Sequence, residues 1–151
     1  MMKKTIICLL LLSFSIGMEA QNLHFKDGKF KIVQFTDLHY KLGNPASRQA
    51  TDCLYEIVKA EQPDLVVLTG DVIYSKPGDM CLQQVLNVLS DLKVPFCYLL
   101  GNHDPEQGIP VNQLYDQAQQ NSYCVQPKRN GNTLDYALPI KSGDGTKTAV
   151  V

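Results

Sequence analysis

The stretch Leu65-Val66-Val67-Leu68-Thr69-Gly70-Asp71 decides the fold, because four consecutive apolar residues run into a polar turn. A strand that is apolar on both faces is typical of the interior of a parallel sheet. Two other segments have the same form. Residues 30–36 lead into Asp37-Leu38-His39, and residues 96–100 lead into Gly101-Asn102-His103-Asp104. The sequence therefore predicts three strands that each end in candidate metal ligands.

Helical segments are expected between these strands. Apolar residues recur at helical spacing from Ala46 to Gln62-Pro63, where the helix ends because a residue before proline disfavours the helical conformation. Asp79 is a suitable N-cap for a second helix. The order strand, helix, strand, helix, strand predicts an α/β fold with parallel crossovers. Further along, the pattern predicts a helix over residues 110–122 and strands over residues 133–138 and 146–151.

The spacing of the polar turns predicts that they meet. Asp71 follows Asp37 by 34 residues and Asn102 follows Asp71 by 31, which is close to the roughly 30 residues of one strand-helix-strand unit. Each unit returns the chain to the same edge of the sheet, and open α/β sheets bind ligands outside the carboxyl ends of their strands. We therefore expect the three turns to form one site.

Composition and the N-terminal residues limit the class of protein. A chain of 151 residues with a formal net charge of −1 lacks the basic balance of nucleic-acid-binding modules. Residues 1–20 predict a secretory signal peptide, because Lys3 and Lys4 precede a mostly apolar run that is shorter than the ~18–20 residues needed to span a bilayer. A membrane anchor is the alternative. We expect an exported protein, periplasmic or secreted, with no stable membrane span after cleavage.

Four cysteines lie beyond this predicted signal peptide: Cys53, Cys81, Cys97 and Cys124. In an oxidising compartment they could form two disulfides by any of three pairings. Their spacing lacks Cys-x-x-Cys, which disfavours a zinc site. We favour buried free thiols, because Cys53 and Cys81 fall on apolar faces of predicted helices and Cys97 lies in a predicted strand.

The three turns carry oxygen and nitrogen ligands in a specific order. Asp37-Leu38-His39 places a carboxylate and an imidazole two residues apart, and Gly70-Asp71 adds a second carboxylate. Either pattern alone is frequent and also fits an ordinary turn. In Gly101-Asn102-His103-Asp104 the glycine permits an unusual backbone, the asparagine offers a neutral oxygen and the histidine is a potential proton donor. Together, at this spacing, they predict a metal site.

These segments resemble the first three motifs of the calcineurin-like metallophosphoesterase superfamily, over about residues 30–110. The motifs are Phe35-Thr36-Asp37-Leu38-His39, Leu68-Thr69-Gly70-Asp71 and Leu99-Leu100-Gly101-Asn102-His103-Asp104. The residues that follow two of these motifs, Tyr40 after the first and Val-Ile-Tyr after the second, resemble those of the exported, purple-acid-phosphatase-like branch of the superfamily. The resemblance implies an α/β/β/α sandwich in the complete domain, with this chain as its first half.

The resemblance also implies a reaction, the hydrolysis of small-molecule phosphate esters by a metal-bridged hydroxide at a dinuclear metal centre. Asp37 and His39 would bind one metal ion, Asp71 would bridge both ions, and Asn102 would bind the second. Iron, manganese and zinc all suit a nitrogen and oxygen ligand set.

Other residues near these ligands have different expected roles. His103 would stabilise the transition state or protonate the leaving oxygen, and Asp104 would either orient that imidazole or hydrogen-bond the turn. In true purple acid phosphatases a tyrosine at the position of Tyr74 binds ferric iron, but their first motif lacks the histidine found here as His39. We therefore expect Tyr74 to pack beside the site. His24 is expected on the surface.

The family pattern includes three later histidines, and none follows His103 here. We therefore interpret residues 21–151 as the N-terminal part of a longer metallophosphoesterase domain, inactive by itself. The alternative is a non-catalytic binding or scaffold module with the same fold, which holds if the gene ends at Val151. Reading the gene beyond that codon separates the two interpretations.

Overall fold

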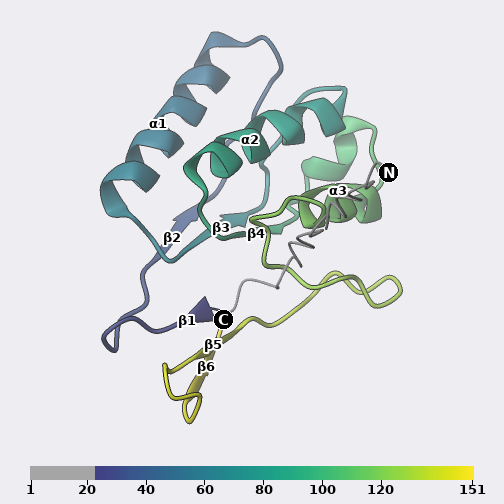
Figure 1. The fold of residues 1–151 in the computed structure, drawn as a ribbon. Helices are drawn as coiled ribbons and strands as arrows, with labels where there is room; N and C mark the ends of the chain where they lie inside the picture. Colours follow the sequence, from purple (N-terminus) through teal and green to yellow (C-terminus); the bar gives the residue numbers. More distant parts are fainter. Residues whose placement is uncertain (1–22) are drawn as a thin grey trace, which may run out of the picture.

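The computed structural model describes residues 23–151, and the predicted signal peptide lies outside them. Three layers follow one another in this part of the chain (Figure 1): a layer of helices, a parallel three-stranded sheet, and a smaller three-stranded sheet. This arrangement confirms the predicted α/β class. Within residues 23–151, no helix has both the length and the apolar character needed to cross a bilayer.

The central sheet is parallel and consists of β2 (Ile32–Phe35), β3 (Leu65–Thr69) and β4 (Phe96–Leu99), with β3 in the middle. β3 is buried except at its last residue, as its apolar run predicts, whereas β2 is a partly exposed edge strand. The register places Phe35 beside Leu68 and Thr69 beside Leu99. All three strands therefore end at nearly the same level, and the turns after them start from one edge of the sheet.

The two connecting helices are α1 (Pro45–Glu61) and α2 (Gly78–Leu92). Asn44 caps α1 by accepting a hydrogen bond from a first-turn amide at 2.9 Å. Gln62 and Lys93 end the helices in the left-handed conformation, with φ of 47° and 54°. The prediction that Asp79 caps α2 was wrong. Pro77 holds that position and Asp79 lies in the first turn, where a carboxylate still suits the helix dipole.

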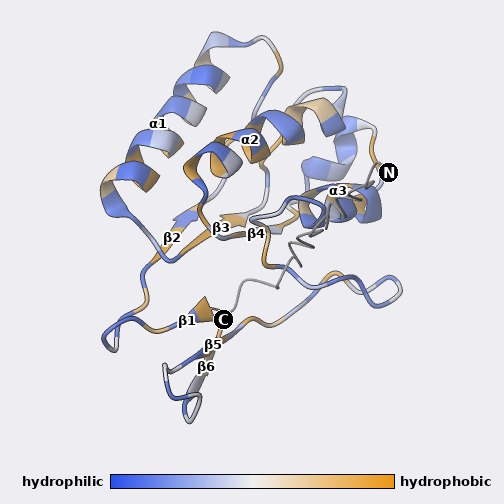
Figure 2. Cartoon of the chain, viewed as in Figure 1, coloured by the Kyte–Doolittle hydropathy of each residue, from blue (hydrophilic) through white to orange (hydrophobic). Residues whose placement is uncertain are grey.

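An apolar core lies on each face of the central sheet. Alternate residues of β3 divide between them, with Val66 and Leu68 packed on the helical side and Leu65 and Val67 packed against the smaller sheet. The smaller sheet consists of β1 (Leu23–His24), β5 (Pro139–Lys141) and β6 (Thr148–Val150), with β5 in the middle. Figure 2 shows hydrophobic residues concentrated on β3 and β4, whereas much of α1 is hydrophilic.

The C-terminal part of the described chain agrees with the sequence predictions in part. Helix α3 (Val111–Gln119) and strand β6 fall inside the segments predicted for them. The predicted strand over residues 133–138 was wrong, and the strand β5 begins at Pro139 instead. Pairing starts only at Leu138, which exchanges backbone hydrogen bonds with Val151 at 2.8 and 3.1 Å. The residues before it follow an irregular path.

The four cysteines among the described residues are all free thiols. Cys81 and Cys97 are buried, as predicted, and Cys124 is half-buried. The prediction for Cys53 was wrong, because its side chain is exposed on α1. The buried positions of that helix are Ser47, Thr51, Leu54 and Val58, a stripe with helical spacing that leaves Cys53 outside it.

Candidate metal centre

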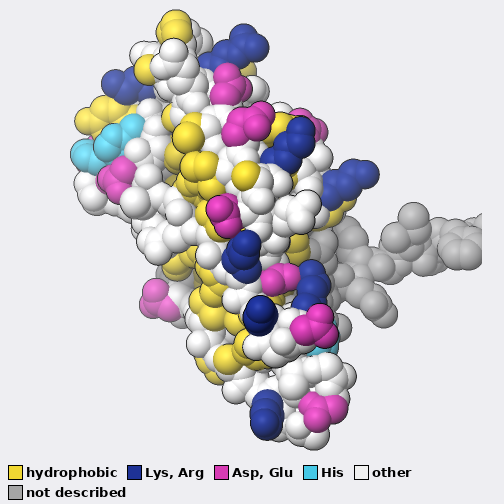
Figure 3. All heavy atoms as spheres, turned by 90° about the vertical axis from the view of Figure 1, so that its left-hand side faces the viewer, with side chains coloured by type: hydrophobic (Ala, Val, Ile, Leu, Met, Phe, Trp, Pro, Cys, Tyr) yellow, Lys and Arg dark blue, Asp and Glu magenta, His cyan; other side chains and the backbone are white. Residues whose placement is uncertain are grey.

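Asp37, His39 and Asp71 meet at the carboxyl edge of the central sheet, as the spacing of the turns predicts. One ligand atom from each residue lies within 4.8 Å of the other two. His39 Nε2 is 3.7 Å from Asp37 Oδ1 and 3.7 Å from Asp71 Oδ2. The side chains of Asp37 and His39 are 60% and 40% exposed, so part of this site is open to solvent. Figure 3 shows histidine and acidic side chains next to each other on one face of the molecule.

The backbone is left-handed at all three residues, with φ of 55° at Asp37, 45° at His39 and 50° at Asp71. Residues other than glycine adopt this conformation rarely and at a cost in free energy, and such strain gathers at functional sites. Hydrogen bonds hold the strained segments side by side: the amides of Asp37 and His39 donate to the carbonyls of Gly70 and Asp71 at 3.1 and 2.9 Å. The first two turns are thus joined directly.

Glycines allow the third turn to approach Asp71 closely. A Cβ atom on Gly101 would lie 2.2 Å from Asp71 Oδ1, and one on Gly70 would lie 2.7 Å from Gly101 Cα. The backbone amide of His103 donates to Asp71 Oδ1 at 2.8 Å, which brings the backbone of the neighbouring, exposed Asn102 to the same side. One oxygen of Asp71 therefore holds the third turn, while the other faces His39.

The side chains of this cluster fit a metal ion. His39 Nε2 is buried and has no hydrogen-bond partner among the described residues, although it faces two carboxylate oxygens. Ligand atoms bound at about 2.1 Å to one ion lie ~3–4 Å apart, which is the separation seen between this nitrogen and both oxygens. Imidazole and carboxylate groups are also ligands that zinc, iron and manganese accept.

His103 is held by a residue that sequence reasoning missed. Its Nδ1 lies 2.7 Å from Glu106 Oε2, and this hydrogen bond raises the pKa of the imidazole. His103 immediately precedes the 3₁₀ helix η1 (Asp104–Gln107), in which residues three apart eclipse one another. The signal in the sequence was an acidic residue three positions after the histidine. That spacing predicts a contact only if the segment is known to be helical.

Asp104 connects the second and third turns. Its side chain is fully buried, and Oδ1 accepts hydrogen bonds from the Val72 and Ile73 amides at 2.9 and 3.0 Å while Oδ2 accepts one from Gly101 at 2.7 Å. Burial raises the pKa of this carboxyl, and the amide donors oppose that rise. Of the two roles left open for Asp104, the structure therefore shows hydrogen bonding of the turn.

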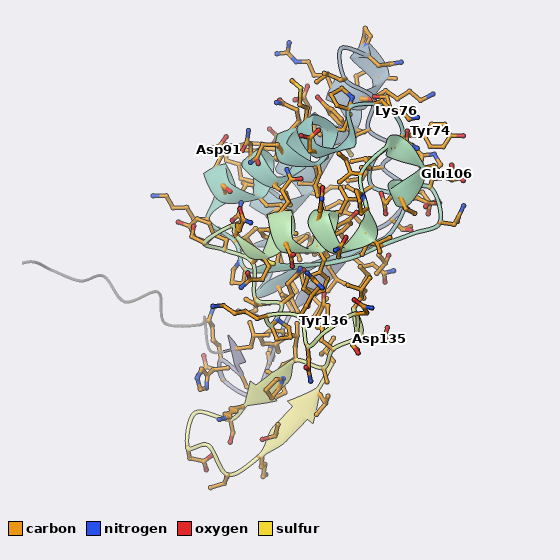
Figure 4. All side chains as sticks on the ribbon, turned by 90° about the vertical axis from the view of Figure 1, so that its right-hand side faces the viewer. Tyr74, Lys76, Asp91, Glu106, Asp135 and Tyr136 are labelled. Carbon is orange, nitrogen blue, oxygen red and sulfur yellow. The ribbon has the colours of Figure 1, made fainter. Side chains whose placement is uncertain are left out.

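Tyr74 packs beside the site, as expected. Its ring stacks on His39 with centroids 4.8 Å apart and meets His103 edge-on at 4.9 Å. Lys41 Nζ lies 4.8 Å from the centroid of the same ring. In Figure 4, Tyr74 and Glu106 lie at the same end of the molecule. His24 is exposed on β1, in the smaller sheet and away from these turns.

Comparison with known proteins gives matches over most of the described chain. The family model described as calcineurin-like phosphoesterase matches residues 30–149. A protein of Arabidopsis thaliana named probable inactive purple acid phosphatase 29 is 29% identical over 125 residues, covering 71% of this chain and 32% of that protein.

Two bacterial relatives show a similar degree of likeness. An uncharacterized metallophosphoesterase of Campylobacter jejuni is 36% identical over 104 residues, covering 68% of this chain and 25% of that protein. A probable cyclic nucleotide phosphodiesterase of Psychrobacter arcticus is 33% identical over 91 residues, covering 52% of this chain and 32% of that protein. The chain thus spans between a quarter and a third of the length of these relatives.

Proposed function

This chain belongs to the calcineurin-like phosphoesterase family, and from that premise we propose that it supplies metal ligands and a proton donor for the hydrolysis of small-molecule phosphate esters. The observation that carries the proposal is the cluster of Asp37, His39 and Asp71, in which a buried imidazole nitrogen faces two carboxylates and has no hydrogen-bond partner within residues 23–151. Export of the protein is part of the proposal and rests on the sequence of residues 1–20 alone.

A dinuclear centre would use both oxygens of Asp71. Asp37 and His39 would hold one ion, Asn102 would hold the second, and Asp71 suits the bridging position because Oδ2 faces His39 while Oδ1 faces the third turn. Iron, manganese and zinc all match these ligands. When bound, the two ions would neutralise charge on the phosphoryl group and lower the pKa of water.

His103 would act on the leaving oxygen. Since Glu106 holds Nδ1, the ring nitrogen left for the substrate is Nε2. As the bond between phosphorus and the leaving oxygen breaks, that oxygen takes the Nε2 proton. Water supplies the new oxygen on phosphorus, and the proton that it loses returns to the imidazole through solvent. The products are an alcohol and inorganic phosphate, or a monoester where the substrate is a diester.

Metal removal and add-back on the complete gene product tests this proposal. After chelation, addition of iron, manganese or zinc is expected to restore hydrolysis of p-nitrophenyl phosphate or bis-p-nitrophenyl phosphate. Asp71→Asn should lower that turnover by at least about 100-fold. Loss of a residue that only orients a metal ligand costs up to about 100-fold, and loss of a ligand should cost at least as much. Asp135→Asn, at an exposed position, is the matched control. Absence of turnover with every metal would contradict the proposal and favour a non-catalytic module.

A further inference from the structure

We propose that Glu106 is a positioning residue, which fixes the nitrogen of His103 that faces the reacting ester. This inference deepens the proposed function and rests on it. Glu106 Oε2 lies 2.7 Å from His103 Nδ1, and the carboxylate side chain is 57% exposed. A carboxylate accepts hydrogen bonds only, so Nδ1 is the donor in this contact. With both ring nitrogens protonated, Nδ1–H stays with Glu106, and the proton given to the substrate is the one on Nε2.

The fold builds this contact from neighbouring residues. The backbone amide of Glu106 donates to the His103 carbonyl at 3.2 Å, which closes the first turn of η1 and places the two side chains above one another. The Gln107 side chain donates to the same carbonyl at 2.9 Å. The contact between the carboxylate and the imidazole is therefore local and follows from the conformation of η1.

Among the contacts of His103, the hydrogen bond with the Glu106 side chain is the one that distinguishes its two ring nitrogens. Asp71 Oδ1 accepts from the backbone amide, Gln107 donates to the carbonyl, and the Tyr74 ring packs edge-on at 4.9 Å. Rotation of an imidazole about its last side-chain torsion is soft, and edge-on packing fits either ring orientation. Without Glu106, the ring would therefore divide its population between two orientations.

The consequence concerns one step of the reaction. When the bond between phosphorus and the leaving oxygen breaks, the electron pair stays on oxygen, which takes the Nε2 proton. Nδ1–H stays in its hydrogen bond with Glu106. A poor leaving group such as an alkoxide needs this proton, whereas p-nitrophenolate departs without it. Loss of Glu106 should therefore affect substrates unequally.

Glu106→Ala in the metal-loaded complete gene product tests this inference with a series of phosphate monoesters. We expect kcat to fall by about 10- to 100-fold for alkyl leaving groups and by less than about 3-fold for p-nitrophenyl phosphate, with KM little changed. Glu106→Gln, which keeps an oxygen acceptor, should restore most of the loss. Glu56→Ala, at an exposed position on α1, is the control. An equal loss for every leaving group would overturn the inference.

A double-mutant cycle separates positioning from a general effect on the fold. Added to His103→Gln, Glu106→Ala should cause no further loss, since it acts through the imidazole. Independent, multiplicative losses would overturn the inference. Nitrogen-15 NMR of labelled histidine provides a readout that does not need turnover. The Nδ1 proton of His103 should be observed in the wild type and lost in Glu106→Ala, and its persistence would contradict the role of Glu106 even if no metal restores hydrolysis.

Discussion

Gly101→Ala is expected to push the second and third turns apart. The new Cβ would lie 2.2 Å from Asp71 Oδ1 and 2.3 Å from the Asp71 amide nitrogen. Carbon and oxygen atoms in contact normally stay at least about 3.3 Å apart, so the turns must separate by about 1 Å. Gly101 does not have a positive φ, so alanine suits its backbone. The effect therefore comes from this contact alone.

A separation of about 1 Å exceeds the tolerance of a metal site, where bond lengths vary by about 0.2 Å. We expect the affinity for metal to fall by about 10- to 100-fold, as it does when groups that orient ligands are lost. The free energy of unfolding should fall by about 1–3 kcal/mol, which is typical of overpacking. Both effects have one cause and should appear together.

Competition with a chromophoric chelator measures the affinity for zinc or manganese, and urea denaturation of the chelated protein measures the stability. Gly143→Ala is the matched control, because its Cβ would meet no atom within 4 Å. If Gly101→Ala binds metal within about 2-fold of the wild type and unfolds at the same urea concentration, the two turns do not separate and the expected effect is refuted.

Three further substitutions test other contacts. Asp104→Asn replaces one of two accepting oxygens with a donor and should lower the free energy of unfolding by about 1–3 kcal/mol; a urea midpoint equal to that of the exposed control Asp91→Asn would contradict this. The hydrogen bond from Arg129 lowers the pKa of Asp116 in the folded protein. The pair therefore stabilises the folded state at pH values above the unfolded pKa of Asp116, about 4. This stabilisation is lost as the pH falls through the lower pKa that Asp116 has in the folded state. The urea midpoint of Arg129→Gln should therefore be below that of the wild type at neutral pH and converge with it once the pH is below the folded pKa of Asp116. A difference in midpoint that stays constant over this range would argue against the pair. Tyr74→Phe keeps the stacked ring and should bind iron within about 2-fold of the wild type; a visible tyrosinate absorption band that disappears in this variant would show Tyr74 to be a ligand.

Predictions that depended on periodicity and topology were largely confirmed. The apolar run of β3 indicated a central parallel strand because both of its faces had to be covered. When strand-helix-strand units of similar length link parallel strands, the carboxyl ends of the strands meet at one edge of the sheet. For this reason, the positions of Asp37 and Asp71 in the sequence were enough to predict that they lie close together. The turn of Asn102 follows the next strand along the chain and was expected beside them for the same reason.

Features that depended on local backbone geometry were not predictable in the same way. Cys53 fell outside the buried stripe of α1 because one position along a helix turns the side chain by about 100°. Glu106 reaches His103 because the two residues are three apart at the start of the short helix η1, and no hydrophobic pattern predicted a helical turn there. The strand over residues 133–138 failed because a strand needs a partner, and pairing with the last strand begins at Leu138.

The central claim is that Asp37, His39 and Asp71 hold a metal ion. Anomalous X-ray diffraction from crystals of the complete gene product loaded with manganese measures this directly. We predict an anomalous peak about 2.1–2.3 Å from His39 Nε2 and from one carboxylate oxygen each of Asp37 and Asp71, absent in crystals of Asp71→Asn. A manganese peak elsewhere, with none between these three side chains, would contradict the claim.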